Sequence, residues 1–215
     1  MDRTTSFVRN CVVVVALQLI YSMSSAQIMG SMHMSTPMNH PKSHKSKNVY
    51  LVMMDSMMVQ MDKAASTTSA ETDFVSQMIP HHEGAVAMAK YEIQYGKNFE
   101  MIQLAKSILT EQQSELQQMR IWLLKHSETE PSLPKGYNQE MDKTMSTMMD
   151  NMPAPDKLND TDHAFALVMI PHHQAAVDMA KVVLKYAKDQ QTIAFATQLI
   201  SNEQVEIEQM IAYSK

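Results

Sequence analysis

The stretch Met78-Ile79-Pro80-His81-His82 occurs again as Met169-Ile170-Pro171-His172-His173, 91 residues further along the chain. At this offset the match continues without a gap in both directions. Other identical pairs are Phe74 and Phe165, Met88 and Met179, Lys90 and Lys181, and Tyr95 and Tyr186. A helical unit this short buries its apolar face best against a second copy. The repeat therefore predicts one unit used twice and packed on itself.

The composition indicates an all-α protein. Among 215 residues there are 23 methionines but only 4 glycines and 5 phenylalanines. Such a chain, rich in Met, Ala, Gln and Lys, favours helices. The net charge of -5 argues against nucleic acid as a partner and gives no sign of a basic membrane-binding face.

Residues 1–26 have the pattern of a secretory signal peptide. Arg3 and Arg9 flank the start of the apolar stretch Cys11–Ile20, and Ser24-Ser25-Ala26 supplies small residues for cleavage. The apolar stretch is too short to span a bilayer, so we expect no stable membrane insertion after cleavage. The predicted location is the periplasm or the cell exterior. Cleavage would remove the only cysteine, which leaves Met and His as the soft-metal ligands.

Residues 27–48 show no helical period and are predicted to form a disordered arm. Its methionines and histidines either capture metal or are incidental to a polar linker. They are Met29, Met32, His33, Met34, Met38, His40 and His44.

The remaining sequence predicts two equivalent helical repeats, at 49–125 and 139–215, joined by a linker at 126–138. Thr68 followed by Glu71 fits a capping box at the start of the first long helix. Four long helices joined in pairs by short turns form a four-helix bundle. Two short Met-rich helices are appendages to it or lids on it. The predicted helices are 50–63, 70–95, 99–125, 139–152, 162–186 and 189–213.

Each repeated motif places imidazoles and thioethers on one face of its helix, beside alanines that leave room for a ligand. The alternative is that the methionines are core and the histidines are satisfied buried polar groups. A duplicated core would also repeat, but adjacent His with flanking Met in both copies favours metal. The candidate ligands are Met78, His81, His82 and Met88, and Met169, His172, His173 and Met179.

The short helices supply a second set of candidate ligands at i, i+3, i+4 and i+7. This face either docks on the bundle as a hydrophobic lid or binds metal, and both uses are compatible. Its members are Met54, Met57, Met58 and Met61 in the first repeat, and Met145, Met148, Met149 and Met152 in the second.

Two features leave alternatives open. Pro80 and Pro171 either interrupt a helix or begin one, and both geometries suit a ligand site. The partner helices carry Gln or Glu within apolar stripes. These residues either orient the ligating imidazoles or form a ladder of polar contacts at the bundle edge. They are Gln112, Glu115, Glu203 and Glu206.

Thioethers select Cu(I) and Ag(I) over zinc, iron or calcium. The chain has no Glu-x-x-His motif for a di-iron bundle and no HExxH motif. We therefore predict a metal-binding protein without catalytic residues.

The pattern from Met78 to Ala89, repeated from Met169 to Ala180, resembles a ferritin-like family long classed as a domain of unknown function. Its characterised members include a periplasmic copper-binding protein. The resemblance covers residues 50–215 and implies a ferritin-like bundle that binds Cu(I) and Ag(I) through Met and His. It also implies a role in copper resistance or periplasmic copper handling. The family's histidine pair and following methionine map to His81, His82 and Met88, and to His172, His173 and Met179.

The predicted function is an exported protein that sequesters or shuttles copper, with Cu(I) as cargo and Ag(I) as its substitute. Expected partners are copper ions, a copper efflux system or copper oxidase, and a second copy of the chain. One alternative is a ferritin-like metal oxidase. Another is a structural bundle whose methionine faces dock partner proteins.

Overall fold

The computed structural model describes residues 47–64, 67–126 and 132–215. The predicted signal peptide, almost all of the predicted arm and residues 127–131 of the predicted linker lie outside the described residues.

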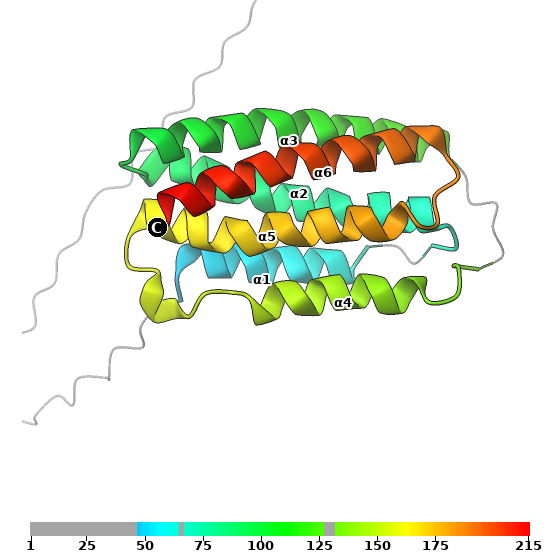
Figure 1. The fold of residues 1–215 in the computed structure, drawn as a ribbon, viewed down its shortest axis with the longest axis horizontal. Helices are drawn as coiled ribbons and strands as arrows, with labels where there is room; N and C mark the ends of the chain where they lie inside the picture. Colours follow the sequence, from blue (N-terminus) through cyan, green and yellow to red (C-terminus); the bar gives the residue numbers. More distant parts are fainter. Residues whose placement is uncertain (1–46, 65–66, 127–131) are drawn as a thin grey trace, which may run out of the picture. The chain divides into compact units, whose positions relative to one another are not determined.

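The described part of the chain contains six α-helices, one 3-10 turn and no strand, which confirms the predicted all-α class (Figure 1). The helices are α1 (Val49–Asp62), α2 (Ala70–Tyr95), α3 (Phe99–Lys125), α4 (Tyr137–Asp150), α5 (Thr161–Val183) and α6 (Gln190–Tyr213). The 3-10 turn, η1, is Pro155–Lys157.

Polar side chains fix where most helices begin, since each accepts a hydrogen bond from a backbone N–H of the first turn. These N-caps are Asn48, Ser69, Asn98, Asp160 and Asp189. Ser69 caps α2, one residue after the predicted Thr68, and its hydroxyl also donates to Glu71.

The helix ends agree with the sequence prediction to within one residue, except that α4 is shifted by two residues at both ends and α5 ends early. Helix α4 begins two residues before the predicted Gln139, after Gly136 in the left-handed conformation. Helix α5 ends at Val183, three residues before the predicted Tyr186. Tyr186 instead closes a tighter turn onto Val183 and donates its hydroxyl to Glu140 of α4.

The helices pack in three layers. Helices α2 and α5 contact each other in the middle layer, between α3 and α6 on one side and α1 and α4 on the other (Figure 1). The short Met-rich helices therefore cover the bundle as lids, with Met54, Met57 and Met148 buried beneath them. Covered on two sides, α5 buries residues around most of its circumference.

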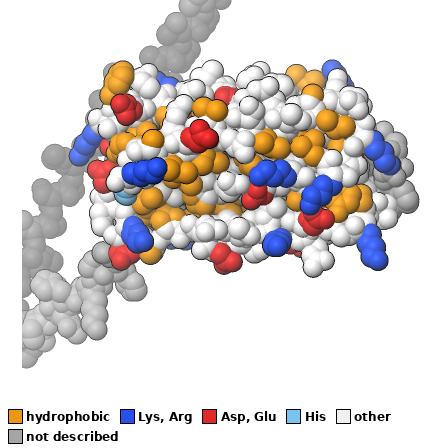
Figure 2. Space-filling view, viewed as in Figure 1, with side chains coloured by type: hydrophobic (Ala, Val, Ile, Leu, Met, Phe, Trp, Pro, Cys, Tyr) orange, Lys and Arg blue, Asp and Glu red, His pale blue; other side chains and the backbone are white. Residues whose placement is uncertain are grey.

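The outer surface mixes apolar and charged side chains. On the face formed by α4, α5 and α6, a band of hydrophobic surface runs between scattered lysines and acidic residues (Figure 2). Half-exposed Val205 and Ile211 of α6 belong to the exposed apolar residues. No helix in the described ranges combines the length and the apolar character needed to cross a membrane.

Gly84 sets the contact between α1 and α2. A Cβ atom there would lie 3.0 Å from Cγ and Sδ of Met57. We expect Gly84→Leu to push α1 off the bundle and to lower the free energy of unfolding by about 1–3 kcal/mol. Denaturant titration measures this. Gly84→Ala is the control, because the flexible Met57 side chain yields to a single methyl group. A Leu variant as stable as the wild type would show that close packing of Met57 on Gly84 is not needed to hold α1 against α2.

Candidate metal centre

The two repeated motifs meet at the contact between α2 and α5. Pro80 and Pro171 lie inside their helices, so the histidines that follow are in mid-helix and not in a first turn. The rings of His81 and His172 stack with their centroids 3.8 Å apart and their planes at 34°. Both side chains are fully buried. Since these residues are 91 positions apart, the stack joins equivalent points of the two repeats.

The neighbouring histidines turn toward the partner helix of their own repeat. His82 Nε2 lies 2.8 Å from Glu115 Oε2, and His173 Nε2 lies 2.9 Å from Glu206 Oε2. A carboxylate at this distance accepts a hydrogen bond from the ring N–H and fixes the ring orientation. Glu115 and Glu206 therefore hold imidazoles, one of the two roles that the sequence left open.

Gln112 and Glu203 take the other role. Gln112 Nε2 donates to Glu203 Oε1 at 2.9 Å and links α3 to α6. Burial raises the pKa of Glu203 to about 8, so its carboxyl group holds a proton at neutral pH. Burial alone would lower the pKa of His173, but the hydrogen bond that its ring donates to Glu206 and the charge of that carboxylate outweigh burial and raise the pKa.

The centre of the bundle contains buried polar atoms without hydrogen-bond partners. Both ring nitrogens of His81 and of His172 are in this state, as is Nδ1 of His82 and of His173. Burial, followed by the influence of neighbouring imidazoles, keeps the pKa of His81 and His172 well below the usual value. Both rings are therefore neutral at pH 7, the form that binds metal.

The imidazoles do not form a finished metal site. In the described part of the chain, no three His, Cys, Asp or Glu residues are placed to hold an ion together. Ring nitrogens bind metal in the plane of the ring, so two rings packed against each other at a tilt of 34° can share an ion only after one ring turns. The stacked His81 and His172 are thus a pair of available donors rather than a coordination sphere.

A second group of donors lies between the two short helices. A cavity of about 510 Å³ separates the C-terminal part of α1 from the N-terminal half of α4. We call this cavity the methionine cleft. Its walls carry five thioethers, those of Met58, Met61, Met141, Met145 and Met179. Asp62, Asp73 and Asp142 also line it. Soft sulfur donors beside carboxylates that favour a cation are suited to a monovalent soft metal.

The cleft draws on both repeats. Met58 and Met61 come from α1, while Met141 and Met145 come from α4 and Met179 from α5. Met58 and Met145 are partly exposed, and the other three sulfur residues are buried. Four of these five methionines were candidates from the sequence, but Met141 was not. The row Met141, Met145, Met148, Met152 at helical spacing is the signal that identifies it.

The family comparison agrees with the repeat seen in the sequence. The family model described as "Domain of unknown function (DUF305)" matches the chain twice, over residues 17–123 and 122–214. The chain belongs to the DUF305 family. The predicted family resemblance and the predicted internal repeat are both confirmed.

Solved structures similar to this DUF305 chain include metal-bound forms of CopM. The silver-bound form obtained by soaking and the Cu(I)-bound form are each 25% identical with a TM-score of 0.50. The matches cover 66% of this chain and 93% and 94% of those CopM chains, respectively. A DUF305 fragment from Deinococcus radiodurans, at 22% identity and a TM-score of 0.50, covers 69% of this chain and 98% of its own and shares the fold. No curated protein sequence matches the chain.

The other candidate methionines of this DUF305 chain lie in four environments. Met54, Met57 and Met148 are buried where α1 and α4 meet the bundle, as a docked hydrophobic face requires. Met78, Met88 and Met169 are fully buried on α2 and α5. Met149 is 43% exposed, and Met152 lines a separate cavity between α4, α5 and α6. Metal binding at these sulfurs stays a prediction.

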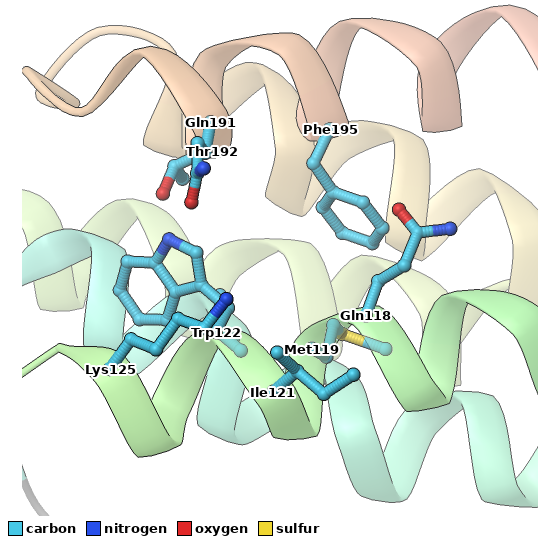
Figure 3. Close-up of a pocket in the computed structure, with 9 residues that line it drawn as sticks. Gln118, Met119, Ile121, Trp122, Lys125, Gln191, Thr192 and Phe195 are labelled. Atoms are coloured by element: carbon cyan, nitrogen blue, oxygen red, sulfur yellow. The ribbon is translucent and has the colours of Figure 1, made fainter.

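A further cavity, of about 350 Å³, lies between α3 and α6. Trp122 and Phe195 face it from the two helices (Figure 3). Its wall contains one thioether, from Met119, and no imidazole. This donor set does not favour a soft metal, so the methionine cleft is the stronger site.

The raised pKa of Glu203 predicts a pH-dependent stability. The folded state holds this proton up to about pH 8, whereas an unfolded Glu releases it near pH 4.3. The associated stabilisation is therefore complete below the unfolded value and is lost as the pH rises through 8. Glu203→Gln keeps a partner for Gln112 but cannot ionise. We expect it to be more stable than the wild type at pH 9, by roughly 1–3 kcal/mol, and similar at pH 5.

Denaturant unfolding at both pH values measures the difference. Glu208→Gln, on the exposed face of the same helix, is the control and should follow the wild type. If Glu203→Gln and the wild type lose stability in parallel between pH 5 and pH 9, the carboxyl group is already ionised in the folded protein.

Proposed function

We propose that this protein is exported and binds Cu(I), with Ag(I) as a substitute, in the methionine cleft, where it sequesters or shuttles copper. The observation that carries the proposal is that five methionines from both repeats line one cavity. Methionine sulfur is soft and uncharged, so it prefers Cu(I) and Ag(I) to harder cations. The similarity to CopM structures in silver-bound and Cu(I)-bound forms supports the same choice of ion.

The position of the cleft suits uptake from solution. Met58 and Met145 are partly exposed at its walls, whereas Met61, Met141 and Met179 are buried. An arriving ion would meet the exposed thioethers first and then the buried ones. Asp62 and Asp142 are exposed beside them, and their charges would favour a cation over a neutral ligand.

The imidazole pair His81 and His172 is a second candidate for the same ions. Its nitrogens are buried, neutral and without hydrogen-bond partners. A metal there would have to enter the bundle and turn at least one ring. The proposal therefore gives the cleft the capture of copper and gives the imidazoles a role after capture.

The location and biological role belong to the proposal as well. The predicted signal peptide supports export, and loss of the only cysteine on its cleavage leaves thioether and imidazole donors for an oxidising compartment. Copper resistance or homeostasis is the role that these properties fit. A ferritin-like oxidase would need carboxylates gathered round its metals, and no such group occurs in the described residues.

Removing the cleft sulfurs tests the proposal. We expect Met58→Leu, Met61→Leu, Met141→Leu and Met145→Leu, combined in one variant, to keep the fold because volume and apolarity are retained. Its affinity for Cu(I), measured by chelator competition on the mature chain, should fall at least tenfold. Met119→Leu with Met210→Leu, at equivalent core positions of α3 and α6, is the matched control. Unchanged Cu(I) affinity in the cleft variant would refute the proposed site.

Replacing His81 and His172 with Phe tests the imidazoles separately. Phe fills a similar volume and removes the unpartnered nitrogens, so thermal stability in the absence of metal should be kept or increased. We expect Cu(I) binding at the cleft to persist, while the total copper per chain at saturation falls. Identical copper content in the variant and the wild type would confine the imidazoles to a structural role.

A further inference from the structure

The two repeats are related by an internal two-fold axis. Three contacts join residues exactly one repeat apart: the stack of His81 on His172, the hydrogen bond between Gln112 and Glu203, and that between Glu111 and Asn202. A residue can contact its own counterpart only close to such an axis. The cleft residues other than Leu133 therefore have counterparts at the opposite end of the α1 and α4 pair, which we call the mirror position.

The mirror position keeps most of the sulfur. Met58, Met61, Met145 and Met179 correspond to Met149, Met152, Met54 and Met88, respectively. The fifth cleft methionine, Met141, corresponds to Tyr50. On thioether count alone, the mirror position would be a second copper site.

The polar wall of the cleft has no equivalent there. Asp142 and Asp73 correspond to Leu51 and Ala164, and Thr67 and Gln77 correspond to Leu158 and Val168. All four replacements are buried apolar residues, between 0% and 7% exposed. An ion at the mirror position would lose its hydration, and the carboxyl group beside Tyr50, that of Glu92, already accepts the hydrogen bond of the tyrosine hydroxyl.

Tyr50 occupies the mirror position as a plug. Its side chain is fully buried, and its ring packs on Tyr91 and Phe165 at centroid distances of 5.3 and 6.0 Å. Its hydroxyl donates to Glu92 Oε2 at 2.8 Å. The counterpart of Glu92 in the other repeat is Val183, so this anchor belongs to one end of the molecule only.

The methionines of the mirror position do not gather round one cavity. Met149 is exposed, and Met152 lines the cavity on the side of α6 together with Ile170 and Ile211. Met54 and Met88 are buried core residues. The four mirror methionines are thus divided among solvent, a different cavity and the core, whereas the five cleft methionines share one cavity.

We infer that the described residues of the two repeats form a single methionine copper site, and that Tyr50 closes the symmetry-related second one. The inference rests on the proposed function of the methionine cleft. The two ends of the layer formed by α1 and α4, which we call the lid layer, therefore have different uses. One end binds the ion. At the other end, Tyr50 holds α1 against α2 and α5.

Two matched variants of the full mature chain test this, with Ag(I) titration followed by native mass spectrometry. The cleft variant carries Leu at Met58, Met61, Met141 and Met145, and the mirror variant carries Leu at Met149, Met152, Met54 and Met88. We expect the cleft variant to bind fewer silver ions than the wild type and the mirror variant to bind the same number. Comparing variants with the wild type cancels any silver held by other residues of the chain.

The outcomes separate the two claims. A mirror variant that loses as much silver as the cleft variant would overturn the single-site inference while leaving the cleft in place. A cleft variant that loses nothing would overturn the proposed function, and the inference with it. If neither variant loses silver, the proposed function is overturned in the same way.

Opening the plug is the complementary experiment. We expect Tyr50→Met combined with Leu51→Asp to bind more silver than the wild type, provided that circular dichroism shows the helical fold. A folded double variant with unchanged silver content would show that Tyr50 is not what closes the second site. If the double variant unfolds, the mirror variant alone decides the question.

Discussion

The pairing of α2 with α5 is the contact on which the rest of the structure depends. Each hairpin, α2 with α3 or α5 with α6, leaves the first helix apolar on faces that its partner cannot cover. Burial of those faces against the other repeat removes apolar surface from water, and this is the main driving force for folding. His81 and His172 meet in this contact, so polar atoms without partners lie between the two repeats.

Methionine has one observed use and one proposed use in this fold. Its flexible thioether fills irregular gaps, as Met57 does against Gly84, and the same sulfur is a soft metal ligand. The environment decides between them. Where Asp62 and Asp142 keep one end of the lid layer open to water, five thioethers border a cavity. Leu51, Leu158 and Val168 close the other end. The methionines there are either buried in the core, as Met54 and Met88 are, or exposed, as Met149 is.

Most of the fold could be predicted because its signals are local. Capping residues and the 3.6-residue period fix α2 and α3, and the gapless repeat implies the same hairpin again. The early end of α5 could not be predicted, since it follows from a tertiary hydrogen bond between Tyr186 and Glu140. The site was harder to predict. Adjacent histidines looked equivalent in the sequence, yet His81 faces the other repeat and His82 faces Glu115. Met141 lines a cavity, whereas its counterpart Tyr50 fills the equivalent space. This difference depends on the residues packed around each position and appears only in the structure.

Both walls of the methionine cleft belong to one polypeptide, and this affects how the site behaves on dilution. A chain with one repeat would need a second molecule to complete such a cleft, so the site would fall apart as the protein became scarce. Covalent joining turns that encounter into an intramolecular one, with an effective concentration on the order of millimolar. For the proposed copper site, occupancy would then depend on the supply of metal and not on the abundance of the protein.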